Sequence, residues 1–213
     1  AVAQASLTYG RYSSLVYATG ILGGMIADRY LGYQRSIILG GLLMAVGCFM
    51  LLSPEIHLFL IGLAVIVAGN GLFKPNISTM VGKLYAPGDV RRDSGFTIFY
   101  MGINAGAFVA PLITAVWIGA NYGYKYGFLA AAIGMIFGIA VFQVRKGMLG
   151  HVGKSPAGRE GWGPVLNVLV GAILLVPVIY FLLSQSEILG VVLLALFAGL
   201  AVYLIWSGYS ETS

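Results

Sequence analysis

The sequence predicts an all-α integral membrane protein. Of its 213 residues, 59% are hydrophobic and only 9% are charged, whereas a soluble domain carries about 25% charged residues. The mean hydropathy is +0.92. Seven apolar stretches each approach the ~20 residues that a helix needs to cross a bilayer. The 31 glycines fit this class, because small residues let membrane helices approach one another closely.

The apolar stretches follow one another with short connections, except before the sixth. The segment 151–163 is polar, contains glycine and proline, and is predicted to be a linker. We therefore divide the chain into a bundle at 1–147, a cytoplasmic linker at 148–163 and a two-helix transmembrane hairpin at 164–213. The predicted spans are 5–27, 36–53, 58–81, 95–117, 126–144, 164–183 and 187–208.

The basic residues of the connections predict the orientation. One set of alternate connections carries nine Lys and Arg residues, and the other carries only Lys125. The positive-inside rule places the first set in the cytoplasm, so the first span runs inward and we expect another helix before it. This distribution also accounts for the net charge of +5, and we expect no nucleic-acid partner. The nine residues are Arg29, Arg35, Lys83, Arg91, Arg92, Arg145, Lys146, Lys154 and Arg159.

The first connection has the pattern G-x-x-x-D-R-x-x-G-x-x-R, formed by Gly24, Asp28, Arg29, Gly32 and Arg35. This pattern resembles the loop between the second and third helices of the major facilitator superfamily. The aspartate can cap or charge-pair at a helix end, the glycines allow a tight turn, and the arginines can bridge to other helices. Such contacts can form in one transporter conformation and break in the other. The alternative is an ordinary basic loop.

Three later segments narrow the resemblance: GLFKPNIS at 71–78, RRDSGF at 91–96 and FYMGINAGA at 99–107. Together they resemble the proton-dependent oligopeptide transporter (POT) family of the major facilitator superfamily, in order and spacing. The resemblance implies an N-terminal transporter bundle, here helices 2–6, followed by the two-helix hairpin. The family's first helix and C-terminal half have no counterpart in the 213 residues, and we expect both to belong to the same transporter.

Lys74 is a charge inside the otherwise uncharged stretch 58–81. A charge at this depth costs at least ~2.5 kcal/mol and is rare unless it faces a cavity or a partner. Pro75 lacks an amide hydrogen, so with Gly69 and Gly71 it predicts a kinked, thin stretch of helix. The resemblance implies that Lys74 binds the peptide and takes part in proton coupling. The alternative is a lysine that reaches to the membrane interface.

Asn104 lies centrally in the stretch 95–117, between Gly102 and Gly106. The two glycines form a small-xxx-small face that favours close helix packing. An amide on this face offers both hydrogen-bond donors and acceptors. By the resemblance it contacts the peptide backbone or terminus, and the alternative is a hydrogen bond between helices.

Aromatic residues complete the predicted site. Tyr17 matches the second-helix tyrosine that lines the family's peptide site, with core packing as the alternative. Tyr12 and Tyr100 are weaker candidates for substrate binding. Tyr12 lies five residues before Tyr17, so its direction is less certain, and Tyr100 belongs to an aromatic stripe of a kind that more often packs. Arg11 either faces a cavity or lies near the outer interface.

All seven carboxylates lie in connections, near span ends or in the C-terminal tail, and both histidines, His57 and His151, lie in connections. A proton-coupled carrier needs a titratable group with access from the membrane. We therefore expect the coupling carboxylates outside these 213 residues. With no nucleophile–base pair or metal-ligand cluster, the sequence does not predict an enzyme.

The resemblance as a whole implies a symporter that imports di- and tripeptides with protons by alternating access. The proton gradient supplies the energy, and no cofactor is expected. The implied location is the inner (plasma) membrane, with the lipid bilayer as a partner. Two alternatives stay open: a facilitator carrier for another small solute, and a membrane receptor or scaffold that transports nothing.

Overall fold

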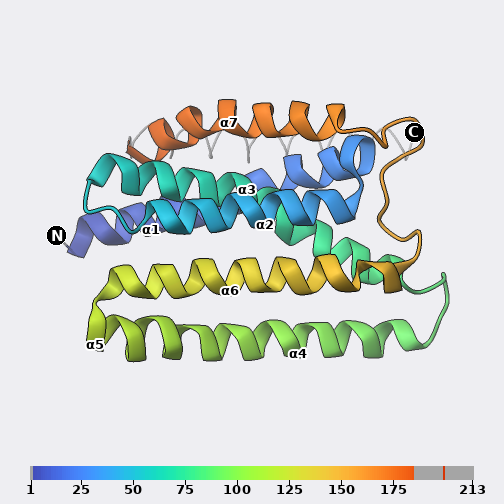
Figure 1. The fold of residues 1–213 in the computed structure, drawn as a ribbon, viewed down its shortest axis with the longest axis horizontal. Coiled ribbons are helices and arrows are strands. Elements are labelled where there is room, and N and C mark those ends of the chain that lie inside the picture. The colour runs from blue at the N-terminus through green and yellow to red at the C-terminus, as the bar shows by residue number, and fades with distance from the viewer. Residues whose placement is uncertain (1, 185–198, 200–213) are drawn as a thin grey trace.

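The computed structural model describes residues 2–184 and Gly199, and every regular element among them is helical (Figure 1). The predicted all-α class is confirmed. Most of the predicted span 187–208 lies outside the described residues. The elements are α1 (Val2–Ile26), η1 (Ala27–Leu31), α2 (Tyr33–Met50), α3 (Ile56–Lys83), α4 (Arg91–Pro111), η2 (Leu112–Gly119), α5 (Ala120–Tyr122), α6 (Tyr124–Arg145), η3 (Lys146–Leu149) and α7 (Gly163–Ser184).

Five helical segments are long and apolar enough to cross a membrane, among the residues that the structure describes. The helix α1 is not one of them, although it has 25 residues. It carries Arg11 together with serine, threonine and tyrosine side chains, which lower its hydropathy. The five segments are Tyr33–Met50, Ile56–Lys83, Arg91–Tyr122, Tyr124–Leu149 and Gly163–Ser184.

The basic connections gather at one end of the bundle. The turn between α1 and α2, the connection from α3 to α4 and the segment that follows α6 lie at the same end in Figure 1. The connections from α2 to α3 and from α5 to α6 lie at the other end. This arrangement agrees with the orientation that the basic residues predict.

Glycines set the spacing between α2 and α3, which pack along their length (Figure 1). A Cβ on Gly40 would lie 2.5 Å from the carbonyl oxygen of Gly69, and one on Gly47 would lie 2.7 Å from that of Gly62. Backbone therefore meets backbone at two levels, as is typical of membrane helices with small residues at their interface.

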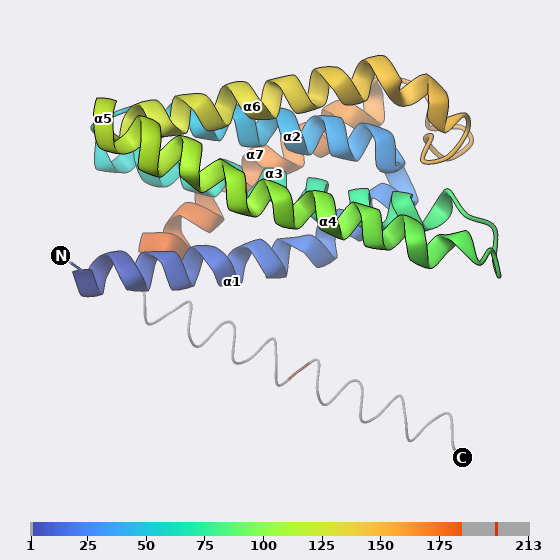
Figure 2. The same cartoon turned by 90° about the horizontal axis from the view of Figure 1, so that it is seen from below.

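A second contact surface joins α1, α3 and α7. Its buried apolar side chains form one cluster, and polar bonds join the C-terminal end of α7 to α1, which it lies beside in Figure 2, and to the start of α3. Arg11 Nη1 on α1 donates to the carbonyl oxygen of Leu183 at 2.7 Å, and His57 Nδ1 lies 2.8 Å from the hydroxyl of Tyr180. The cluster comprises Leu15, Ala64, Val67, Ala68, Ile179 and Leu183.

The helix α4 stands apart from this core, and none of its residues is buried. It approaches α3 only near the basic end, where Phe96 lies beside Gly82. At Gly102 and Gly106 a Cβ would meet nothing within 4 Å in the described part of the chain. The close packing predicted for this small-xxx-small face is therefore not formed between the described helices.

Candidate functional site

The structure brings Lys74 and Tyr17 together across the contact between α3 and α1. The ammonium nitrogen of Lys74 lies 4.9 Å from the centroid of the Tyr17 ring. Both side chains are exposed, and Tyr17 is 70% exposed. A cation–π contact at such a site contributes roughly 0.5–1 kcal/mol, which orients the lysine without neutralising it.

The Lys74 ammonium lies deep along its helix. Lys83, where α3 ends, is nine positions further along the helix, and this corresponds to about 14 Å at a rise of 1.5 Å per residue. The one ion pair within the described chain joins Arg91 to Asp89. Lys74 thus has no carboxylate partner among the described residues, and its charge is free to bind an anionic group.

Asn76 fixes the helix that carries Lys74. Its side chain is fully buried, and Nδ2 donates to the carbonyl oxygens of Gly23 at 3.1 Å and Leu72 at 2.7 Å. The bond to Gly23 joins α3 to α1. We considered Asn76 only as part of a family segment, because its role depends on a partner that is distant in sequence.

The backbones of α1 and α3 touch at the same level. A Cβ on Gly23 would overlap the carbonyl oxygen of Gly71, and one on Gly71 would lie 2.7 Å from that of Thr19. Pro75 has no amide hydrogen to donate to Gly71, so this carbonyl is free to face the neighbouring helix. The helix α3 nevertheless continues through Pro75 to Lys83.

The candidate residues of α4 are exposed, and within the described chain they form no hydrogen bond or ring contact with Lys74 or Tyr17. Asn104 makes no hydrogen bond with any described residue. Tyr100 stacks on Phe96, with ring centroids 6.2 Å apart, and also contacts Phe99. Asn104 is thus available to a ligand, while Tyr100 belongs to an aromatic cluster of its own helix.

Tyr12 has different surroundings from Tyr17. It is half-buried and packs against the cluster that joins α1, α3 and α7. The structure therefore gives Tyr12 a packing contact, whereas Tyr17 on the same helix is exposed beside Lys74.

The predicted conformational motif forms a tight turn. Gly32 has φ +74° and ends the π-helical turn η1, and its N–H donates to the carbonyl oxygen of Ala27 at 2.8 Å. The Asp28 carboxylate accepts a short hydrogen bond from the Tyr33 hydroxyl. Gly24, in contrast, has open space around it, so the structure shows no close approach there.

Arg35 holds the segment that follows α6. Its guanidinium donates to the carbonyl oxygens of Gly161 at 2.8 Å and Arg159 at 3.3 Å, and also to that of Glu160. We predicted that Arg35 bridges to other helices. In the described chain it binds the predicted linker instead.

Further bonds join the linker to the end of η1 and the start of α2. Gln34 Nε2 donates to the carbonyl oxygen of Val152 at 2.7 Å, and its backbone N–H donates to that of Gly153 at 2.9 Å. Ser155 Oγ donates to the carbonyl oxygen of Leu31 at 2.8 Å. The linker is therefore a packed part of the basic end.

Replacing Arg35 by glutamine is expected to loosen this linker, because the shorter amide cannot reach all three carbonyl oxygens. Limited trypsin digestion of the membrane-embedded protein at Lys154 and Arg159 should become several-fold faster. Arg92→Gln is the matched control, since Arg92 lies over the Phe96 ring and does not contact the linker. Equal cleavage rates in the two variants would contradict the assignment.

Asp89 is the acidic residue of the α3–α4 connection. Hydrogen bonds from the Arg91 side chain and backbone lower the pKa of Asp89 to about 2. Its side chain is only partly exposed, and it stays ionised near neutral pH. Asp89 therefore does not have the pKa expected of a group that binds and releases protons during transport.

Membrane-length helices with basic connections at one end define a multi-pass membrane protein. Solved structures support this class. A peptide transporter POT in complex with alafosfalin matches 95% of this chain with a TM-score of 0.71 and 39% identity, over 42% of its own length. A bacterial homologue of the human drug peptide transporters matches 95% of this chain with a TM-score of 0.81 and 30% identity, over 46% of its length.

The chain belongs to the POT family, whose sequence model matches residues 34–175. The resemblance noted from the sequence is thereby confirmed. A di-/tripeptide transporter of Lactococcus lactis is 42% identical over 87% of this chain and 38% of its own length. An uncharacterized transporter of Bacillus subtilis, YclF, is 47% identical over 68% of this chain and 30% of its own length. The chain thus spans at most about two-fifths of these curated relatives.

Proposed function

We propose that this chain contributes the substrate-binding side of a proton-coupled symporter, which imports di- and tripeptides by alternating access across the inner (plasma) membrane. The observation that carries the proposal is the Lys74–Tyr17 pair, with its unneutralised ammonium deep along α3. A peptide zwitterion offers the carboxylate that such an ammonium binds. Relatives named di-/tripeptide transporters support this substrate class.

Each group has a distinct task in this proposal. Lys74 binds the C-terminal carboxylate of the peptide, and the Tyr17 ring keeps the ammonium directed toward it. Asn104, which has no hydrogen-bond partner among the described residues, binds a polar backbone group. Because these contacts address the peptide backbone, the carrier can accept different side chains.

The proton is carried elsewhere in this proposal. Of the five carboxylates that the structure describes, three lie in connections, one in η1 and one in the first turn of α4. The coupling group then belongs to segments of the transporter beyond this chain, such as a preceding helix and a C-terminal half. The energy comes from the proton gradient, without a cofactor.

Uptake of a labelled dipeptide by the intact transporter in proteoliposomes tests the substrate class. We expect uptake to require an inward proton gradient and to be suppressed by unlabelled di- and tripeptides, but not by nitrate or a glycoside. Competition by one of the latter would favour a carrier for another solute. Absence of any gradient-driven flux would favour a receptor or scaffold.

Replacing Asn104 by alanine is expected to weaken dipeptide binding about 3- to 10-fold, the loss of one net hydrogen bond. Thermal stability should not change, because the side chain is exposed and bonds to no described residue. Asn121→Ala is the matched control. Asn121 is an exposed asparagine at the end of the bundle that lies opposite the basic end, and it donates to the Trp117 carbonyl oxygen. Unchanged affinity in Asn104→Ala would leave Asn104 without a binding role.

A further inference from the structure

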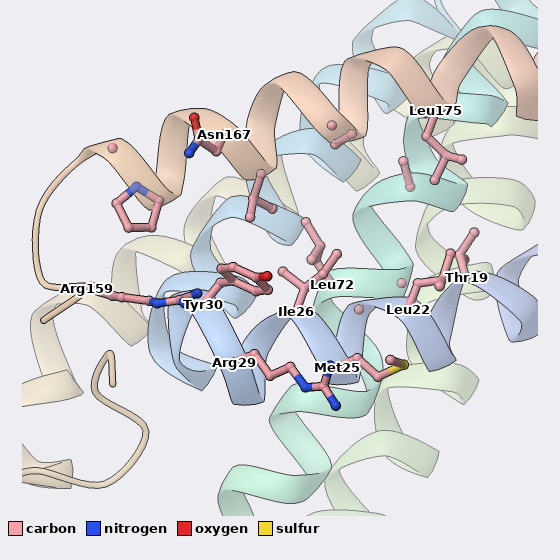
Figure 3. A pocket seen from close by; sticks show the side chains of 18 residues that line it. Thr19, Leu22, Met25, Ile26, Arg29, Tyr30, Leu72, Arg159, Asn167 and Leu175 are labelled. Carbon is pink, nitrogen blue, oxygen red and sulfur yellow. The ribbon is translucent and has the colours of Figure 1, made fainter. Parts of the chain in front are cut away.

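A cavity of about 770 Å³ lies between α1, α3 and the start of α7 (Figure 3). Its volume is in the range of small-molecule binding sites. Neither Lys74 nor Tyr17, Tyr12, Asn104 or Tyr100 lines it. It is therefore separate from the candidate peptide site.

The cavity has a polar end and an apolar wall. Arg159, Tyr30 and Asn167 lie toward one end in Figure 3, and Leu175 on α7 lies toward the other. The polar end adjoins η1 and the linker, which belong to the basic end of the bundle. Much of the remaining lining is aliphatic or glycine, including Leu22, Ile26, Leu72, Val168 and Gly171.

The cationic groups of the polar end have no acidic partners. Neither Arg29 nor Arg159 forms an ion pair within the described part of the chain. The Arg159 guanidinium lies 4.1 Å from the Tyr30 ring centroid, a contact that orients it. Its Nη1 is buried and has no hydrogen-bond partner among the described residues. A buried cationic donor without a hydrogen-bond partner is unfavourable, so this position favours an anionic acceptor.

We propose that this cavity binds an anionic phospholipid of the cytoplasmic leaflet, with its phosphate at Arg159 and an acyl chain along α1 and α7. The positive charge at one end of the cavity and the aliphatic wall both favour an anionic lipid as the ligand. The positive-inside orientation puts the arginines at the cytoplasmic headgroup level, where basic pockets between membrane helices bind anionic lipids. A peptide zwitterion also carries an ammonium group, and no carboxylate of the described chain lines the cavity to pair with it.

Native mass spectrometry of the purified, delipidated transporter, titrated with phosphatidylglycerol or phosphatidylethanolamine, tests the proposal. We expect preferential binding of phosphatidylglycerol, weakened about fivefold by Arg159→Gln, the effect of one basic contact. Arg145→Gln should leave binding unchanged, because Arg145 is a basic residue at the same end that does not line the cavity. Equal binding of the two lipids, or equal affinity in the two variants, would overturn the proposal.

Gly171→Leu provides a second variant that keeps both arginines. A Cβ at Gly171 meets nothing within 4 Å, and the residue lines the cavity, so the larger side chain should fill the space without displacing α7. We expect reduced phosphatidylglycerol binding at unchanged thermal stability. Full binding in Gly171→Leu would show that the lipid sits elsewhere. Dipeptide affinity is measured in parallel, so that a failure of the peptide proposal is distinguished from a failure of this one.

Discussion

Replacing Lys74 by alanine is expected to abolish proton-driven peptide uptake by the intact transporter. The ammonium has no carboxylate partner among the described residues, so its removal takes away the charge that meets the peptide carboxylate. The bound peptide excludes water from this charge pair, and loss of one partner of such a pair costs roughly 2–5 kcal/mol, which corresponds to a decrease of at least about 30-fold. The measurement is the initial rate of labelled dipeptide uptake into proteoliposomes with an imposed pH gradient.

Lys125→Ala is the matched control for this variant. Lys125 also lies over a tyrosine ring, at 5.1 Å from the Tyr126 centroid, but at the opposite end of the bundle. Dipeptide uptake by the Lys125→Ala variant should match that of the wild type, because the contact between Lys125 and Tyr126 is of the same kind but lies away from the candidate site. Wild-type uptake in Lys74→Ala would remove the basis of the proposed function.

Replacing Gly23 by alanine is expected to have the largest effect on stability. The added methyl would overlap the Gly71 carbonyl oxygen, and neither backbone can give way without separating α1 from α3. Overpacking of this kind costs roughly 1–3 kcal/mol. It would also lengthen the Asn76 bond to Gly23 and displace Tyr17 from Lys74. Thermal unfolding in detergent measures the loss directly.

The neighbouring glycine supplies the control. Gly24→Ala adds the same methyl group one residue later on the same helix, where a Cβ meets nothing within 4 Å. Its unfolding temperature should be close to that of the wild type. If the two variants are equally stable, the close approach of α1 and α3 at Gly23 is wrong.

The sequence predicted the Lys74–Tyr17 pair as site members because each residue carries its own signal. One is a charge in an apolar span and the other matches a family position. Asn76 lies in a family segment and Gly23 in a pair of glycines, but neither signal identifies a partner, since both roles depend on a contact between α1 and α3. The docking of the linker on Arg35 was missed for the same reason.

The small-xxx-small face of Gly102 and Gly106 shows a second limit of prediction from the sequence. The pattern predicts that a helix can be approached closely, but it does not identify the helix that approaches. Among the described residues nothing occupies that face, and Asn104 between the two glycines stays exposed.

The helix boundaries differ where local backbone chemistry outweighs hydropathy. The span predicted at 36–53 begins at Tyr33, directly after the positive-φ glycine of the motif. The span predicted at 95–117 begins earlier, at Arg91, and continues through η2 to Tyr122. Hydropathy misses the first turn because its residues are polar. Hydropathy alone detects neither the Asp89 bond to the first turn nor the π-helical continuation.

The central claim is that Lys74 recognises the carboxylate of the peptide. The most direct test compares the affinity of a dipeptide with that of the same dipeptide bearing a C-terminal amide, in the wild type and in Lys74→Ala. We predict that the wild type binds the free acid at least about tenfold more tightly, and that Lys74→Ala binds both equally. Discrimination that persists undiminished in Lys74→Ala would contradict the claim.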